Sequence, residues 1–189
     1  FLAALDAPAW TAPSWCDGWT VRDVAGHLLM PLEVSVPRLA WRIITSRGFD
    51  RAADALSREI AAGREPAALV ASLRARADKR FKPPGLGPIA PLTDICVHTR
   101  DIERPLGIAC TLQPDDLRAV LTWLSSGAKG FVDPARSAGL RYEATDLAWA
   151  HGDGPLVRGP GDAIALALTG RTGAFAELEG DGVAVLRAR

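Results

Sequence analysis

The chain has 189 residues and 48% hydrophobic content, enough for one large domain or two small ones with apolar cores. Its 22 Lys and Arg residues balance its 22 Asp and Glu residues, so no net charge attracts nucleic acid or an anionic membrane. The longest apolar runs, such as residues 163–168, are far shorter than the roughly 20 residues of a membrane-spanning helix. We therefore expect a soluble globular protein with neither nucleic acid nor membrane as a partner.

The cysteines and the first residues predict a cytoplasmic protein. Cys16, Cys96 and Cys110 are odd in number and lack CxxC spacing, which argues against a disulfide framework and against an all-thiol zinc site. Residues 1–10 contain no basic segment of a secretory signal. They also lack an initiating Met, so we expect a short stretch to precede Phe1. Abundant Ala, Arg, Gly and Pro with three Lys suggest a GC-rich bacterial genome.

The first clear helix is predicted to begin near Val21. Thr20 is a suitable N-cap, and Asp23 at the third helical position can return a capping-box hydrogen bond. Apolar residues follow at helical spacing, with His27 at the margin of their stripe. Pro31 predicts an end or a kink of this helix.

Further helices are predicted along the first two thirds of the chain, separated by breaks rich in Gly and Pro. Residues 82–92 contain four Pro and two Gly and predict a loop. The expected helices cover residues 37–44, 51–61, 66–81, 93–104 and a stretch from Pro114 to about residue 124. Helices in this number predict an up-and-down bundle.

Beyond about residue 136 the pattern changes to short alternating segments bounded by Gly. Residues 140–145 and the end of the chain predict strands, while residues 161–169 predict one apolar helix. The predicted fold class is α+β, with a helical domain at residues 1–130 and a small antiparallel α/β domain at residues 138–189 in which one helix covers three or four strands.

Two histidines and one aspartate have the spacing of a metal site. Residues four apart on a helix point from one face, so Asp94 and His98 can converge on one ion, and His27 would complete a set of three ligands. Three protein ligands with an open fourth position are typical of catalytic zinc. Asp101, one turn beyond His98, is expected to accept a hydrogen bond from its ring, although Asp101 could instead be a ligand.

Simpler interpretations exist for each of these residues. A histidine beside an apolar helix face is commonly a packed and hydrogen-bonded residue, and an Asp-x-x-x-His pair is common on solvated faces. We expect Cys16 to pack as a small apolar residue, Cys96 to point away from the ligand face, and His151 to lie in a turn between strands. None of these three is expected to be catalytic.

Three strings resemble the mycothiol-dependent maleylpyruvate isomerase family of actinobacteria. They are APSWCDGWTVRDVAGHLL, DICVHTRDIERPLG, and VRGPGDAIALALTGR followed by LEGDGVAVL, in the order of the family. The resemblance implies a DinB-like four-helix bundle at the N-terminus and a divalent metal, usually zinc, bound by His27, Asp94 and His98. The family commonly has Glu where Asp94 stands, and the shorter side chain can change metal affinity or metal choice.

The chemistry that the resemblance implies uses mycothiol as a small-molecule thiol. A metal-bound thiolate would add to the double bond of a maleylpyruvate-like substrate and leave after rotation, or would add to another electrophile and remain as a conjugate. The resemblance also brings Arg171 near the metal as a partner for substrate carboxylates. Arg100, Arg104 and Arg22 flank the ligands too, but we expect them to be solvated or paired with neighbours, for example with Asp23 and Glu103.

Two other functions fit the same residues. A hydrolase of the DinB-like type would use the metal to activate water and would need no thiol. A noncatalytic binding or regulatory protein could keep the fold without useful metal chemistry, and the Asp94 departure motivates this alternative. The balanced charge is compatible with a monomer or a homodimer.

Overall fold

The computed structural model describes residues 1–81, 83 and 85–189, and their packing divides the chain into two compact units. Unit 1 comprises Phe1–Pro84 with Asp101–Ile108, and unit 2 comprises Gly85–Arg100 with Ala109–Arg189. These bounds are not those of the predicted domains, residues 1–130 and 138–189, which stay a prediction. Lys82 and Pro84, from the predicted loop, lie outside the described residues.

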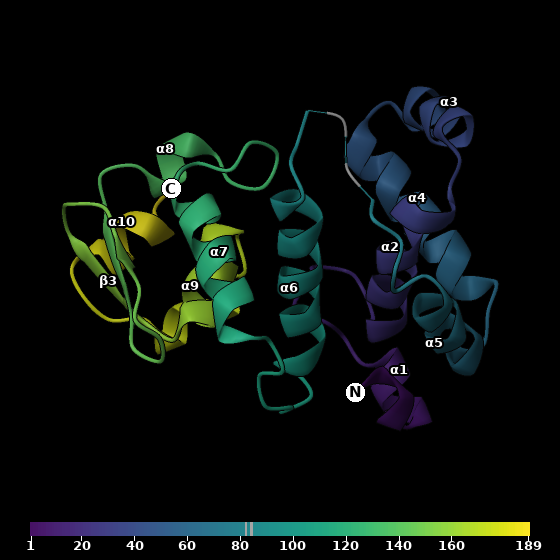
Figure 1. Ribbon diagram of the computed structural model, residues 1–189, viewed down its shortest axis with the longest axis horizontal. Helices are drawn as coiled ribbons and strands as arrows, with labels where there is room; N and C mark the ends of the chain where they lie inside the picture. The colour runs from purple at the N-terminus through teal and green to yellow at the C-terminus, as the bar shows by residue number, and fades with distance from the viewer. Residues whose placement is uncertain (82, 84) are drawn as a thin grey trace. The chain divides into compact units, whose positions relative to one another are not determined.

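Unit 1 is helical (Figure 1). It contains the 3-10 helix η1 (Leu2–Ala4) and the α-helices α1 (Ala7–Thr11), α2 (Val21–Glu33), α3 (Val36–Ser46), α4 (Phe49–Ala62) and α5 (Pro66–Ala75). The helix α6 (Ile89–Glu103) contributes its last three residues to unit 1 and the preceding ones to unit 2. The helical N-terminal half expected from the sequence is confirmed.

Local signals explain where these helices begin and end. Thr20 caps α2, and its capping box with Asp23 is present as predicted. The helix continues through Pro31 to Glu33, so of the two predicted alternatives at Pro31, the end is wrong and the kink stays a prediction. α6 begins at Ile89 rather than at residue 93, because Pro91 falls in the first turn, where a missing N–H costs nothing.

The core of unit 1 forms where α2 packs against α4 and α5. Fully buried side chains there include Val24, Leu29, Leu56 and Leu69. Gly26 brings the backbones of α2 and α4 together, because a Cβ at this position would lie 2.3 Å from the carbonyl oxygen of Ser57. The close approach of α2 and α4 places the next residue of α2, His27, beside α4.

Unit 2 packs helices on a three-stranded sheet. Its elements are the first twelve residues of α6, then α7 (Pro114–Ser125), α8 (Pro134–Ser137), β1 (Arg141–Ala144), β2 (Ala150–His151), β3 (Leu156–Gly159), α9 (Gly161–Leu168), the 3-10 helix η2 (Thr172–Glu177) and α10 (Gly182–Arg187). α9 is buried along its whole length and packs on α7, β1 and β3. The α+β class is therefore confirmed, with one apolar helix on a small sheet.

The sheet is mixed, so the prediction of a purely antiparallel sheet is wrong. Its strand order is β2-β1-β3, with β2 antiparallel and β3 parallel to β1. After β2 the chain crosses the start of β1 instead of turning back beside β2. Gly152 and Gly154 permit this crossing, because a Cβ at either position would lie within 2.4 Å of the oxygen of Leu140 or Gly139.

The predicted C-terminal strand is also wrong, since residues 182–187 form α10. Pairing with β3 stops after a single bridge between Arg158 and Glu179. Gly180 then turns the chain with a φ of 104°, a conformation that side chains rarely adopt. Leu186 is buried in the helix that follows.

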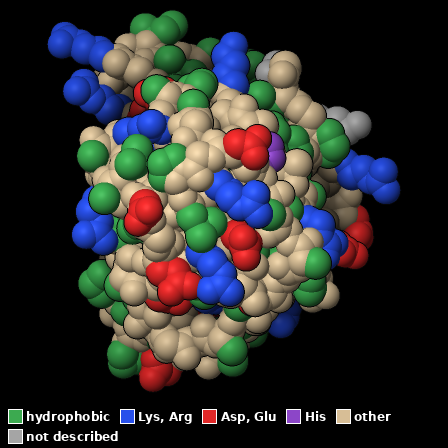
Figure 2. Space-filling view, turned by 90° about the vertical axis from the view of Figure 1, so that its left-hand side faces the viewer, with side chains coloured by type: hydrophobic (Ala, Val, Ile, Leu, Met, Phe, Trp, Pro, Cys, Tyr) green, Lys and Arg blue, Asp and Glu red, His purple; other side chains and the backbone are tan. Residues whose placement is uncertain are grey.

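The face of the molecule near β3 and α10 carries interspersed acidic and basic side chains (Figure 2). Arg158 forms ion pairs there with Glu179 at 2.6 Å and Glu143 at 3.5 Å, and all three side chains are substantially exposed. Among the described residues, no helix combines the length and the apolar character that crossing a bilayer requires.

Candidate metal centre

His27 lies in unit 1 on the side of α2 that faces α4. Its ring is half-buried, and Nδ1 lies 3.2 Å from Oγ of Ser57, which is completely buried on α4. The ring of Trp19 lies 5.0 Å from the imidazole, centroid to centroid, at an angle of 49°. Two neighbours in unit 1 therefore restrict the orientation of the imidazole.

Trp19 is itself held in place by α4. Its indole Nε1 donates a 2.6 Å hydrogen bond to Oδ1 of Asp54. Arg58 donates to the same carboxylate oxygen at 2.9 Å and to the carbonyl oxygen of Gly18 at 2.8 Å. The indole that flanks His27 is thus fixed through hydrogen bonds that lead back to the loop before α2.

Asp94 and His98 lie in unit 2, on one face of α6. Nε2 of His98 is 3.6 Å from Oδ1 of Asp94, and their side chains are 10% and 27% exposed. The structure thus places the two side chains of this predicted pair close together. An imidazole nitrogen and a carboxylate oxygen at this separation can both reach one cation.

Asp101 belongs to the part of α6 that is grouped with unit 1, and it is completely buried. Its backbone oxygen accepts a 2.9 Å hydrogen bond from the amide of Trp15, which ties this turn of α6 to the loop before α2. Its expected role as the acceptor for the ring of His98 stays a prediction.

Arg171 follows the C-terminal end of α9 in unit 2. Its backbone amide donates to Leu166, and its guanidinium donates a 2.8 Å hydrogen bond to the carbonyl oxygen of Thr169. The side chain is half-buried. A guanidinium has a planar set of donors that suits a carboxylate, but the catalytic role of Arg171 stays a proposal.

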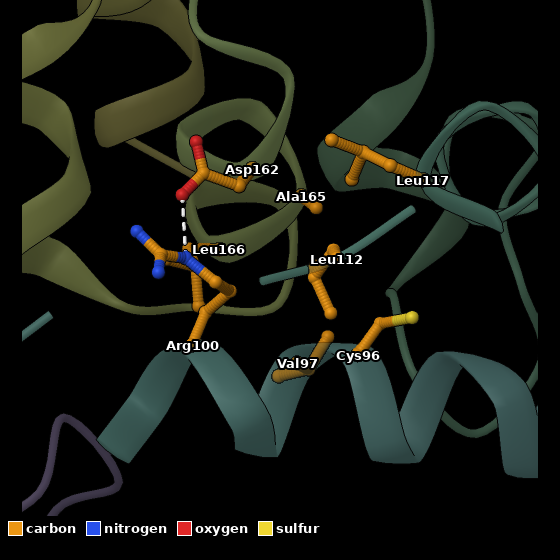
Figure 3. A pocket seen from close by; sticks show the side chains of 8 residues that line it. All are labelled: Cys96, Val97, Arg100, Leu112, Leu117, Asp162, Ala165 and Leu166. Carbon is orange, nitrogen blue, oxygen red and sulfur yellow. Dashed lines mark hydrogen bonds and ion pairs between the residues drawn. The ribbon is translucent and has the colours of Figure 1, made fainter. Parts of the chain in front are cut away.

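A small cavity in unit 2 contains a buried ion pair (Figure 3). Arg100 on α6 and Asp162 on α9 point toward each other, with Nε 2.7 Å from Oδ2, and each side chain is 5% exposed. The remaining lining is apolar apart from Cys96, and the space, about 10 Å³, is close to the minimum for one water. Arg100 is therefore not solvated, and its partner Asp162 lies 62 residues away in the sequence.

The structure gives contacts for the other two flanking arginines, Arg22 and Arg104. Arg22 donates to backbone oxygens of Ala61 and Arg64, because its guanidinium reaches the C-terminal end of α4 and the turn after it. Arg104 places its guanidinium 5.8 Å from the ring centroid of Trp15. Both arginines therefore have structural partners within unit 1.

No catalytic role is predicted for Cys96, Cys16 or His151. Burial raises the pKa of the Cys96 thiol from 9.0 to about 12, so this thiol stays protonated near neutral pH. Cys16 is half-buried against the core of unit 1, as expected. His151 lies in β2 rather than in a turn, and its ring stacks on Trp149 at 6.2 Å.

Sequence reasoning missed two polar residues that contact or support the candidate site. Ser57 lies between Ala53 and Ala61 at a spacing of four residues on the buried face of α4, so it is a polar residue inside an apolar stripe. Asp162 is the one acidic residue of the apolar helix α9. A polar side chain in such a stripe signals a buried partner, although the pattern does not identify that partner.

Comparison with known proteins identifies the N-terminal part of the chain. Residues 1–83 match the family model described as the mycothiol maleylpyruvate isomerase N-terminal domain. The match includes His27 and Ser57 and ends before Asp94, His98 and Arg171. No curated protein and no solved structure matches the chain.

Proposed function

We propose that this chain, whose residues 1–83 belong to the mycothiol maleylpyruvate isomerase N-terminal domain family, is a metalloenzyme that uses mycothiol to isomerise or conjugate a small electrophile. The observation that carries the proposal is the pairing of Asp94 with His98 on α6, in a chain whose matched domain family is defined by mycothiol chemistry. The proposed substrate is maleylpyruvate-like, with at least one carboxylate.

The proposed ligands are His27, Asp94 and His98. They offer two imidazole nitrogens and one carboxylate oxygen, which suit zinc and leave one coordination position for an exogenous group. Local geometry supports each part of this set: Asp94 and His98 share a face of α6, and the ring of His27 is oriented by Ser57 and Trp19. The residues present therefore fit a zinc-type ion.

A bound divalent ion would supply positive charge that favours the thiolate form of a thiol near neutral pH. The protein's own residues would do the rest. Arg171 would bind and orient a substrate carboxylate through its planar guanidinium. Arg100 and Asp162 would hold α6, and with it Asp94 and His98, against α9.

The test is the metal content of the purified protein together with a requirement for thiol. Wild type is expected to contain about one equivalent of zinc, which His27→Ala, Asp94→Ala and His98→Ala each lose. His151→Ala is the matched control, because His151 lies in β2 against Trp149, and this variant is expected to keep its zinc.

Each result separates the proposed function from its rivals. Turnover of electrophiles that requires mycothiol supports the proposal. Zinc-dependent ester or amide hydrolysis without any thiol would replace it with the hydrolase. Absence of bound metal, with no uptake of added zinc or nickel, would refute it and favour a noncatalytic binding protein.

A further inference from the structure

The hydroxyl of Ser57 contacts two groups in unit 1. Its oxygen lies 2.7 Å from the carbonyl oxygen of Ala53, one turn earlier on α4, and 3.2 Å from Nδ1 of His27 on α2. Ser57 is completely buried, so these contacts occur in an apolar core, where each polar group needs a partner.

The single proton of the hydroxyl decides the direction of both hydrogen bonds. A carbonyl oxygen can only accept, so the short contact to Ala53 is a hydrogen bond that Ser57 donates. Ser57 then has no second proton for His27 and offers an oxygen lone pair. Nδ1 of His27 must therefore carry a proton and donate it to Ser57.

We propose that Ser57 is a positioning residue that holds neutral His27 in the tautomer with its proton on Nδ1. Nε2 then carries the ring's lone pair and is the nitrogen that can bind a metal, a step that rests on the proposed function. Metal-binding histidines typically donate their other N–H to a protein acceptor, which fixes the tautomer and the ring orientation. Ser57 supplies such an acceptor from α4.

Packing makes this hydrogen bond a property of the fold. Gly26 allows α2 to approach α4 until the backbone of Ser57 touches α2, which brings the neighbouring ring of His27 within reach of the hydroxyl. The indole of Trp19, fixed by its 2.6 Å hydrogen bond to Asp54, limits rotation of the ring. The acceptor and the indole thus restrict both the tautomer and the plane of the imidazole.

The direct test is the tautomer of His27 in the metal-free protein. Long-range ¹H–¹⁵N NMR correlations, recorded well above the usual imidazole pKa, distinguish a protonated Nδ1 from a protonated Nε2. In wild type we expect the proton on Nδ1, and in Ser57→Ala we expect this preference to be lost. Zinc affinity, measured by competition with a chelator, is expected to fall about 10- to 100-fold in Ser57→Ala.

Ser125→Ala is the matched control. Ser125 is a buried serine on α7 whose hydroxyl also donates to a carbonyl of its own helix, that of Thr122 at 3.2 Å. Its replacement removes a comparable hydroxyl from unit 2, and we expect the tautomer of His27 and the zinc affinity to stay at wild-type values.

The inference and the proposed function fail in different ways. A proton on Nε2 of His27 in wild type, or an unchanged tautomer in Ser57→Ala, overturns the inference whatever the metal content. Wild type that shows the expected tautomer but binds no zinc refutes the metal site and leaves the assignment of Ser57 standing. A loss of zinc affinity in Ser125→Ala equal to that in Ser57→Ala would show a general packing effect and would overturn the positioning role.

Discussion

Breaking the ion pair between Arg100 and Asp162 by removing one partner should cost far more stability than breaking a surface pair of similar geometry. Its N–O distance is 2.7 Å and both side chains are 5% exposed, whereas Arg158 and Glu179 are 2.6 Å apart with side chains 43% and 67% exposed. Removing one partner of a buried pair leaves a buried charge without that partner and costs about 3–5 kcal/mol. An exposed pair contributes about 0–1 kcal/mol because water screens it.

We therefore expect Asp162→Asn to lower the free energy of unfolding by about 3 kcal/mol and Glu179→Gln by less than about 1 kcal/mol. The double variant Arg100→Met/Asp162→Asn should be no less stable than Asp162→Asn, because removing both charges also removes the burial penalty. Urea titrations followed by far-UV circular dichroism measure all of these changes.

Two results would refute this reasoning. Equal and small effects of Asp162→Asn and Glu179→Gln would show that burial does not strengthen the pair. Additive losses in the double variant would show that the two side chains stabilise unit 2 independently of each other.

Three further predictions follow from single sites. In Gly26→Ala the new Cβ would lie 2.3 Å from the carbonyl oxygen of Ser57, so overpacking of about 1–3 kcal/mol should exceed the helix-propensity gain of about 1 kcal/mol and lower the unfolding midpoint. The control Gly63→Ala, whose nearest atom would lie at 3.3 Å, should change that midpoint little. A Gly26→Ala variant more stable than wild type would contradict the packing. Tyr142 is the one tyrosine of the chain, and burial raises its pKa from 10.0 to about 12. Since burial favours the neutral phenol in the folded state, the contribution of Tyr142 to stability is fully present below pH 10 and is lost as the pH rises toward 12. Ultraviolet titration should therefore show no tyrosinate near pH 10 while the circular dichroism spectrum is native. Ionisation of Tyr142 near pH 10 in the folded protein would refute the burial. Thr20→Ala removes the α2 cap and should cost about 1 kcal/mol of thermal or urea stability, with Thr20→Ser close to wild type; equal losses in both variants would argue against the cap.

Features set by neighbours in the sequence could be predicted. The capping box of α2 involves Thr20 and Asp23, and the candidate ligands Asp94 and His98 are one helical turn apart. Such pairs depend on helix geometry alone, so the pattern of residue types is enough to place them. The start of α2 and the i,i+4 pair were predicted for this reason.

Features set by distant contacts could not be predicted in the same way. The alternation in residues 183–186 is compatible with a short strand or a short apolar helix, and the choice depends on Gly180 turning the chain away from β3. The parallel pairing of β3 with β1 depends likewise on a loop that crosses the start of β1. Arg100 and Asp162 are 62 residues apart, so no local pattern joins them.

Ser57 and the Arg100–Asp162 pair share a property that stability alone does not explain. Alanine occupies the positions one turn before and one turn after Ser57 on the same buried face of α4, so neither neighbouring position uses a polar side chain. Apolar replacements of a buried ion pair are often neutral or stabilising. In each case the polar group makes a directional contact that an apolar side chain could not make. Ser57 accepts the Nδ1 proton of His27, and Asp162 binds Arg100, which lies two positions after His98 on α6. Buried polar side chains thus contact α2 and α6, the two helices that carry the proposed ligands, which is expected where orientation has to be controlled.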